Sequence, residues 1–277
     1  MEKPLVSVIM GVYNEEKTIC QCIDSILNQT YTNWEFIICN DCSKDRTLGL
    51  LKEYAEKDSR IIVLNNDKNL RLAASLNKCL VVAKGKYVAR MDADDISLPE
   101  RIETQVAYME NHPDIDCVGC SRIMFDENGD RGIRKGIENP TREILKVRSP
   151  FAHPTIMMKA ETYNELKGYA VSKDGMRAED LELWIRFFMM NKKGYNIQKP
   201  LYKYHESDED YKKRTLKAAI GTSKIFFRGY RLLGFPIYVY PLALKPIVSV
   251  ILPQRLIKEF HSYEEKRNFD TFYMSEK

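Results

Sequence analysis

The sequence predicts an α/β fold in which helices cover a mostly parallel sheet. Apolar runs of strand length recur along the first 90 residues, and segments with apolar residues at helical spacing separate them. In addition, an acidic group formed by Asp92, Asp94 and Asp95 directly follows the fourth apolar run. Open parallel sheets bind their ligands beyond the carboxyl ends of the strands, so this group marks a candidate site.

The first half of the chain supports the alternation element by element. Residues 5–12 are almost wholly apolar, which is typical of a strand buried on both faces of a parallel sheet. Apolar residues then recur at helical spacing from Ile19 to Leu27, with acidic residues ahead of them. The same patterns predict further strands at residues 34–39, 60–64 and 86–90, and further helices around residues 48–54 and 70–83.

The pattern changes beyond Pro99, which is well placed to open a helix over residues 101–111. Asn128-Gly129 is a strong hairpin signal between two predicted strands. A later helix begins at Glu179-Asp180 and shows one apolar face. The strands expected in this half of the chain cover residues 117–125, 131–137, 153–158 and 195–204.

The acidic cluster calls for a counter-charge. Ionised Asp92, Asp94 and Asp95 repel one another, so a stable arrangement needs a cation or strong hydrogen-bond donors. Mg²⁺ uses one or two protein carboxylates and completes its coordination with water and phosphate oxygens. A solvated acidic turn is the alternative. An EF-hand is excluded, because Ser97 stands where its loop requires glycine and Pro99 interrupts the loop.

Three predicted strand ends meet at one edge of the sheet. Tyr13 follows the first strand, Asp41 the second, and Asp92 and Asp94 the fourth. Gly11 stands alone after the first strand, so the G-x-G-x-x-G turn of dinucleotide-binding proteins is absent from the sequence. A cation at Asp94 is then the simplest way to neutralise a bound phosphate.

The seven cysteines favour a reduced, cytosolic setting. Their number is odd, they are spread through predicted strands and helices, and no secretory signal precedes the first strand. Cys39-x-x-Cys42 and Cys117-x-x-Cys120 suggest zinc, but the alternating neighbours of the second pair indicate a strand. Buried free cysteines are therefore the favoured interpretation over zinc.

The net charge of +4 is unevenly distributed. Residues 211–277 carry 13 Lys or Arg against 5 Asp or Glu, so the positive charge lies at the C-terminal end. Residues 235–253 are almost wholly apolar but contain four prolines, which disfavour a single spanning helix. We expect an interfacial element on anionic phospholipid, flanked by Arg228, Arg231, Arg255 and Lys258, rather than a nucleic-acid partner. Packing against the remaining chain or a second copy is the alternative.

In its ordered motifs the sequence resembles the family 2 glycosyltransferases, which are inverting, nucleotide-sugar-dependent enzymes with a Rossmann-like GT-A fold. The resemblance covers about residues 5–205, and each motif is weak alone but the ordered set is specific. The matching motifs are Val6 to Met10 with Tyr13-Asn14-Glu15; Asn40-Asp41 with Ser43 and Asp45; Asn69 with Ala73-Ala74 and Asn77; Gly85 to Tyr87 and Asp92 to Asp95; Gly168-Tyr169; and Glu179-Asp180.

The resemblance implies roles for the residues of the donor site. Tyr13 would stack on the base, and Asp41 would accept a hydrogen bond from a ring N–H, which favours uracil. Asp92 would lie near the ribose and the metal, and Asp94 would bind Mg²⁺ or Mn²⁺ bridging the diphosphate. Arg71 occupies a position where many members have glycine; it would contact the nucleotide or only cap a surface turn.

The resemblance also implies roles for the catalytic base and for residues that would contact the acceptor. Asp180 resembles the catalytic base, because the acceptor hydroxyl must lose its proton as the diphosphate leaves. Burial beside Glu179 would raise the pKa of Asp180 toward the working pH, and Glu179 is also a candidate acceptor residue. His205 is a candidate metal ligand and His153 a candidate acceptor-site residue, while a structural role is the alternative for both.

We therefore expect transfer of a sugar, with inversion, from a UDP-sugar or related donor to a hydroxyl of a glycan or lipid-linked acceptor in surface-polysaccharide assembly. A nucleotidyltransferase that forms nucleotide-sugars, and a non-catalytic membrane-associated nucleotide-sugar-binding protein, are the alternatives. The expected location is the inner face of the cell membrane, and dimerisation is left open. Residues 1–205 would form the catalytic domain, with a nucleotide-binding half (1–98) and an acceptor-binding half (99–205), and residues 206–277 a helical extension.

Overall fold

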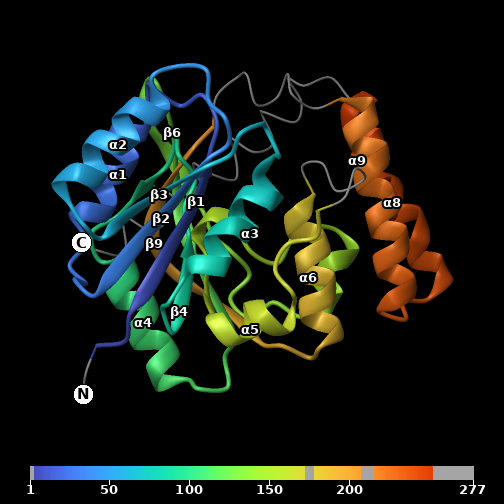
Figure 1. Ribbon diagram of the computed structural model, residues 1–277. Coiled ribbons are helices and arrows are strands. Elements are labelled where there is room, and N and C mark those ends of the chain that lie inside the picture. The colour runs from blue at the N-terminus through green and yellow to red at the C-terminus, as the bar shows by residue number, and fades with distance from the viewer. Residues whose placement is uncertain (1–2, 172–177, 207–214, 252–277) are drawn as a thin grey trace.

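A computed structural model describes residues 3–171, 178–206 and 215–251. Its first half alternates strands and helices as the periodicity predicts (Figure 1). The elements in this half are β1 (Val6–Val12), α1 (Ile19–Leu27), β2 (Trp34–Asn40), α2 (Thr47–Lys57), β3 (Ile61–Asn65), α3 (Leu72–Val82) and β4 (Tyr87–Arg90).

The strands of this half are parallel, as predicted. β1 pairs with β2 on one side and β4 on the other, and β3 extends the sheet beyond β2. Val12 is the register partner of Asn40, so Tyr13 and Asp41 follow neighbouring strand ends. The acidic cluster follows β4, on the other side of β1. The edge that the sequence predicted as a site is therefore formed.

Two hydrophobic layers enclose this sheet. Val8 and Met10 of β1 face a core that includes residues of α1, α2 and α4 (Arg101–Asn111). Ile9 faces the opposite core, which includes residues of α3, α5 (Ala160–Glu165) and α6 (Glu179–Met189). This alternation follows from the two-residue period of a strand, and Figure 1 shows α1 and α2 on one side of the sheet and α3 on the other.

The second half adds strands of mixed direction. The sheet order is β3-β2-β1-β4-β8-β6-β9-β5, with β7 paired to β6. β6 is parallel to β9 and antiparallel to β7 and β8. The strands of this half are β5 (Ile96–Ser97), β6 (Cys117–Asp126), β7 (Gly129–Arg134), β8 (Met157–Lys159) and β9 (Gly194–His205).

One predicted strand is wrong in its first part. Residues 153–158 were expected to be extended, but His153–Thr155 forms a 3₁₀ turn and β8 covers only Met157–Lys159. Pro154 lacks the N–H that a ladder would need, and its ring suits the first turn of a helix. Apolar alternation alone does not reveal this difference.

Arg101 connects the acidic loop to this turn through hydrogen bonds. Its side chain is fully buried, and its Nη2 donates to the carbonyls of Arg90, Pro154 and Ile156 at 2.7, 3.1 and 3.3 Å. The guanidinium lies 4.8 Å from the ring centroid of Tyr202. Burial lowers the pKa of Arg101 from its usual range, yet the carbonyl oxygens accept from its Nη2, and Gln105 Oε1 accepts from its Nε at 3.1 Å. Arg101 thus connects the end of β4 to the His153 turn.

The last described helices pack beside α6. α8 (Leu216–Leu232) contributes Phe226 and Tyr230 to the second core, followed by a 3₁₀ segment (Ile237–Leu244) and α9 (Lys245–Ile251). Figure 1 shows α8 and α9 at the end of the molecule farthest from α1 and α2. In the part of the chain that the structure describes, no helix combines the length and apolar character needed to span a bilayer. Arg255 and Lys258 lie outside the described residues.

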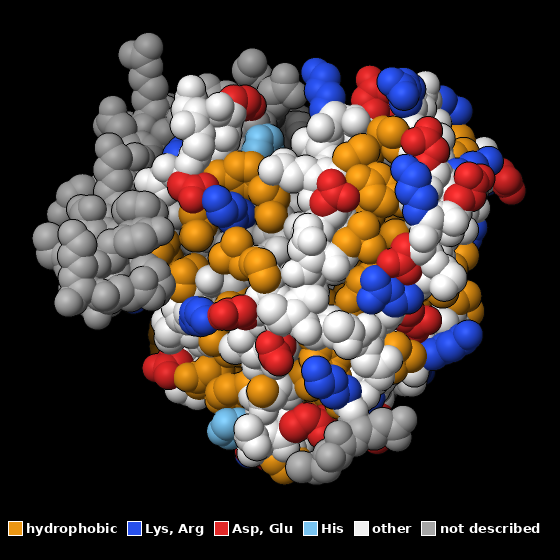
Figure 2. All heavy atoms as spheres, turned by 90° about the vertical axis from the view of Figure 1, so that its left-hand side faces the viewer, with side chains coloured by type: hydrophobic (Ala, Val, Ile, Leu, Met, Phe, Trp, Pro, Cys, Tyr) orange, Lys and Arg blue, Asp and Glu red, His pale blue; other side chains and the backbone are white. Residues whose placement is uncertain are grey.

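The face covered by α1 and α2 carries charges of both signs. Figure 2 shows Lys and Arg side chains interspersed there with Asp and Glu. A field of a single sign, which attracts nucleic acid, does not form among the described side chains of this face.

Candidate active site

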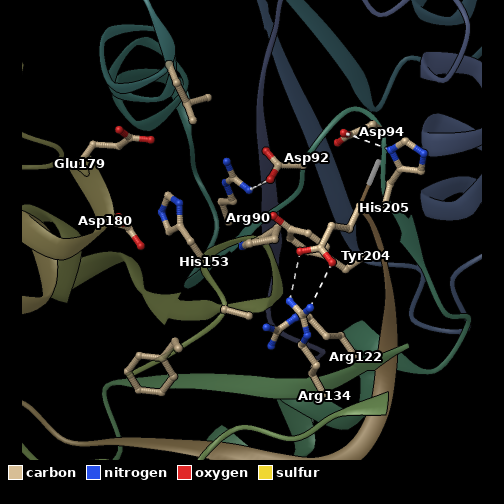
Figure 3. A pocket seen from close by; sticks show the side chains of 15 residues that line it. Arg90, Asp92, Asp94, Arg122, Arg134, His153, Glu179, Asp180, Tyr204 and His205 are labelled. Carbon is tan, nitrogen blue, oxygen red and sulfur yellow. Dashed lines mark hydrogen bonds and ion pairs between the residues drawn. The ribbon is translucent and has the colours of Figure 1, made fainter. Parts of the chain in front are cut away.

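Six of the nine predicted site residues line one cavity. Its volume is about 650 Å³, and its walls include Asp92, Asp94, His153, Glu179, Asp180 and His205. Figure 3 shows Glu179, Asp180 and His153 on one side of this cavity and Asp94 and His205 on the other. These residues come from the end of β4, the turn before β8, the start of α6 and the end of β9. The fold therefore brings together groups up to 113 positions apart in the sequence.

The acidic cluster has the oxygen set of a divalent-cation site. One carboxylate oxygen from each of Asp92, Asp94 and Asp95 lies within 4.8 Å of the others. Asp95 is 2 % exposed, and its buried Oδ2 has no hydrogen-bond partner among the described residues. Burial, Asp94 and Asp92 together raise the pKa of Asp95 well above its ordinary value. An orphaned buried oxygen within a set of hard ligands fits Mg²⁺ or Mn²⁺.

Arg90 partly neutralises this cluster. It is the last residue of β4, is 2 % exposed, and forms an ion pair with Asp92. Its buried Nε has no hydrogen-bond partner among the described residues. Burial raises the pKa of Asp92 more than Arg90 lowers it. The Asp92 carboxylate thus faces both the cluster and a fixed cation.

His205 lies beside the cluster without completing it. Its Nδ1 is 3.7 Å from Asp94 Oδ2, and its backbone N–H donates to Asp95 Oδ1 at 2.7 Å. The group of ligand atoms that lie within 4.8 Å of one another consists of the three aspartates. His205 orients Asp95 through its backbone, and metal ligation by its imidazole stays a prediction.

Asp180 meets the cavity at the first turn of α6. Its Oδ2 accepts a hydrogen bond from Ser149 Oγ at 3.1 Å. Burial raises the pKa of Asp180 above its ordinary value, although the backbone N–H of Leu181 and the Ser149 hydroxyl oppose this. Burial and the charge of Asp180 raise the pKa of Glu179 to about 7. Each of the two carboxyl groups is therefore a weaker acid here than in water.

His153 is held in a fixed orientation. It is 9 % exposed, and its Nε2 lies 2.9 Å from the Tyr169 hydroxyl. Burial and the nearby Arg90 cation lower the pKa of His153 well below its usual value. The imidazole is therefore neutral at physiological pH and offers a hydrogen bond rather than a charge.

Of the three other predicted residues, Tyr13 and Asp41 follow neighbouring strand ends and Arg71 precedes α3. Tyr13 is 44 % exposed, as a stacking platform requires. Asp41 is 3 % exposed, and its carboxylate accepts from Asn66 Nδ2, Leu70 N and Arg71 N, each at 2.7 Å. Only Arg71 N bonds to Oδ2 among these, so this oxygen keeps a free acceptor position for a ring N–H.

Arg71 adopts a backbone conformation that suits glycine. Its φ is 72°, and it precedes the first residue of α3. L-residues other than Asn and Asp rarely adopt positive φ. Asp41 stabilises this conformation through the two backbone N–H groups of Leu70 and Arg71, so Asp41 shapes the loop in addition to any contact with a base.

Sequence reasoning missed several polar residues of the cavity. Arg90, Ser149 and the strand residues Arg122 and Arg134 were not singled out. A charged residue at the end of an apolar run, as Arg90 is, was the one available signal. Arg122 and Arg134 follow from strand pairing across the hairpin, which single-residue patterns do not reveal. The residues that line the cavity and were not predicted are Leu72, Arg90, Arg122, Arg134, Phe151, Ala152, Pro154, Tyr204 and Glu206.

Comparison with solved structures gives the fold. The fold matches S. aureus TarS with a TM-score of 0.61 at 20% identity, covering 90% of this chain and 81% of that one. It matches the mannosyltransferase PcManGT from Pyrobaculum calidifontis with a TM-score of 0.64 at 20% identity, covering 90% and 74%. The fold is the GT-A fold of glycosyltransferases.

Sequence comparison then gives the family. The model for "Glycosyl transferase family 2" matches residues 7–172, more than half of the chain. The putative glycosyltransferase EpsE of Bacillus subtilis is 43% identical over 259 residues, which is 93% of either chain. The chain belongs to glycosyl transferase family 2, and the resemblance seen in the sequence motifs is confirmed.

Proposed function

We propose that this glycosyltransferase moves a sugar from a nucleotide-sugar to an acceptor hydroxyl with inversion, using Asp180 as the general base. One observation carries the proposal: a single cavity joins the carboxylate cluster of Asp92, Asp94 and Asp95 to Asp180. The cluster supplies ligands for a cation on the donor diphosphate. Asp180 supplies a base from a different element, so a sugar between them can be attacked as its diphosphate leaves.

The environment of Asp180 suits proton abstraction. A base is most effective when its pKa approaches the working pH, and burial moves the pKa of Asp180 in that direction. Ser149 fixes one carboxylate oxygen, leaving the other to accept the proton of the acceptor hydroxyl. Neutral His153 also lines the cavity and can donate a hydrogen bond to the acceptor sugar or accept one from it.

Asp94 and Asp95, with Asp92, would hold Mg²⁺ or Mn²⁺. The bound ion would stabilise negative charge that develops on the diphosphate. Tyr13 and Asp41 would hold the base at the adjoining strand ends, which favours UDP. TarS has been solved with UDP-GlcNAc, and PcManGT with GDP-Man and Mn²⁺, so the same fold accepts either base and the base contacts decide between them.

The first prediction concerns donor binding. We expect UDP-sugars to raise the Tm of the full chain in the presence of Mn²⁺, by an amount equivalent to about 2.7 kcal/mol at a ligand concentration 100 times Kd. The shift is expected to disappear with EDTA. A panel of UDP-, GDP- and dTDP-sugars measured by thermal unfolding checks this. Equal stabilisation with and without the metal would contradict the assigned role of the cluster.

The two alternatives lack support from the site. A nucleotidyltransferase would need a glycine-rich basic loop at its first strand, whereas here Met10-Gly11-Val12 ends β1 and Tyr13 follows it. A binding protein without turnover would not need a partly buried carboxylate at Asp180 facing the cation cluster across the cavity. Transfer to a glycan or lipid-linked acceptor in surface-polysaccharide assembly is the favoured setting.

We also propose that the enzyme acts at the inner face of the membrane. Ile237 and Tyr238, at the start of the 3₁₀ segment, are 83 % and 77 % exposed. Exposed cations at Arg231 and Lys245 flank this segment in the sequence. Apolar side chains beside basic residues match the interface of an anionic bilayer.

The second prediction tests this surface. We expect the double variant Ile237→Glu and Tyr238→Glu to bind vesicles containing phosphatidylglycerol about tenfold more weakly than the unchanged protein. Cosedimentation of the full chain measures this binding. Val81→Glu is a matched control, because Val81 is 84 % exposed on α3; its binding is expected to stay unchanged. Equal loss in both variants would contradict a specific contact by the 3₁₀ segment.

A further inference from the structure

The wall of the cavity formed by β6 and β7 carries paired cations. Arg122 of β6 and Arg134 of β7 are register partners in the antiparallel pair, and both line the cavity. Side chains directly opposite in such a pair lie on the same face, about 4.5–5.5 Å apart at Cβ. Like charges in this position destabilise a sheet. The arrangement therefore costs stability unless a negative group lies between or beside the two guanidinium groups.

The nearby acidic residues are engaged mainly with the other arginines. Glu206 forms ion pairs with Arg134 at 3.0 Å and with Arg131 at 2.9 Å. Asp126 lies 3.7 Å from Arg131. None of the ion pairs formed by the described residues includes Arg122. Arg122, Arg131 and Arg134 form an arginine cluster. Of these, Arg122 lies in the cavity wall and forms no ion pair with Asp126 or Glu206.

Arg122 is also incompletely hydrogen-bonded. Its buried Nε has no acceptor among the residues that the structure describes, and its guanidinium lies 5.6 Å from the Tyr204 ring centroid. Burial and the charge of Arg134 lower the pKa of Arg122, and the nearby Glu206 does not offset them. A partly buried cation, whose Nε lacks an acceptor among the described residues and which has a like charge beside it, is suited to binding an anion.

We propose that Arg122 and Arg134 form a subsite for a phosphoryl group of the acceptor, which places the acceptors of this enzyme among phosphorylated sugars. This assignment rests on the proposed function and names its substrate class. Two guanidinium groups match the charge of a phosphoryl group better than that of a carboxylate. Arg122 can donate two parallel hydrogen bonds to it, whereas both Nη atoms of Arg134 donate to Glu206, so Arg134 contributes its charge.

The position of the two arginines favours the acceptor over the donor. They come from the β6–β7 hairpin, whereas the carboxylates that would hold the donor's cation follow β4. Figure 3 shows Arg122 and Arg134 away from Asp92 and Asp94. Asp180 lines the same cavity, so a sugar whose phosphoryl group meets the arginines can direct a hydroxyl toward the base.

The third prediction uses glucose 1-phosphate as a probe. With UDP and Mn²⁺ at saturating concentrations, we expect the full chain to bind glucose 1-phosphate at least about tenfold more tightly than glucose, because charge-assisted hydrogen bonds to arginine add to the affinity. Arg122→Gln is expected to abolish this preference. Isothermal titration calorimetry measures both affinities.

The matched control is Arg131→Gln. Arg131 belongs to the same cluster but does not line the cavity and pairs with Asp126 and Glu206, so the preference for the phosphorylated sugar is expected to persist. Arg122→Lys keeps the charge without the planar donor pair, and partial retention is expected. Circular dichroism and Tm show that each variant folds.

Two results would overturn the subsite. One is equal loss of the preference in Arg122→Gln and Arg131→Gln. The other is displacement of UDP by glucose 1-phosphate, which would place the arginines in the donor site. Absence of UDP binding with Mn²⁺ would instead refute the proposed function, and titration of the nucleotide-free protein with glucose 1-phosphate would still decide the subsite by itself.

Discussion

Replacing Asp180 by Asn is expected to slow turnover of the donor about 10²–10⁴-fold, the range associated with loss of a general base. The amide keeps the shape of the side chain and can still contact Ser149, but it cannot take a proton. Donor binding is expected to remain, because Asp180 lies on α6 rather than in the cation cluster. Release of nucleoside diphosphate from the preferred UDP-sugar with Mn²⁺ measures the rate.

The pH dependence sharpens this expectation. Burial raises the pKa of Asp180 above its ordinary value, so the base becomes available only as the pH rises above the usual aspartate range. The rate should therefore increase with pH across that titration in the unchanged enzyme. In Asp180→Asn this increase should vanish together with the rate.

Glu182→Gln is the matched control for Asp180. Glu182 is an acid in the first turn of the same helix, but it pairs with Arg186 at 2.7 Å and does not line the cavity. We expect its turnover to stay within about twofold, since substitutions away from such sites have small effects. If Asp180→Asn turned over the donor as fast as the unchanged enzyme, Asp180 would not be the general base.

The second large effect is expected for Asp94→Asn. Asp94 is partly exposed to the cavity and contributes one of the three clustered carboxylate oxygens. Its replacement by an amide removes a negative charge from the cluster and a strong ligand from a hard cation. We expect the Mn²⁺-dependent rise in Tm with UDP to be lost, and turnover to fall by about 10³-fold, corresponding to several kcal/mol of lost charge stabilisation.

Glu127→Gln provides the comparison for Asp94. Glu127 is an acid close to the same site, with Oε1 4.0 Å from His205 Nε2, but its side chain is 74 % exposed and it lies outside the carboxylate cluster. Its metal-dependent stabilisation should match that of the unchanged protein. Should Asp94→Asn respond to Mn²⁺ and UDP as strongly as Glu127→Gln does, the cluster would not be the cation site.

The sequence was most informative where one residue pattern determines one local structure. The apolar runs at residues 5–12 and 34–39 correspond to buried parallel strands, and Asp94 and Asp180 could be assigned from their motifs to a common cavity. The turn at His153 was wrongly assigned as a strand. Its proline and its tie to Arg101 depend on contacts between distant segments, which periodicity does not contain.

The charged groups around the cavity show the same limit. Arg90 meets Asp92 because it ends β4, and Arg122 meets Arg134 because two strands pair in a particular register. The first pair is two residues apart and could have been noticed in the sequence, whereas the second depends on a strand register that spacing along the chain does not contain. Ser149 reaches Asp180 from an irregular segment, where sequence patterns are weakest. The acidic residues of the site can thus be predicted from the sequence, but most of the neighbouring groups that shift their pKa values cannot.

The position of manganese in crystals grown with UDP tests the central claim most directly. Its anomalous scattering identifies the ion independently of the nucleotide. We predict a peak between the carboxylates of Asp94 and Asp95 and the UDP diphosphate, with Asp180 facing the same cavity. A nucleotide bound away from the ends of β1, β2 and β4, or a manganese peak distant from Asp94, would contradict the account.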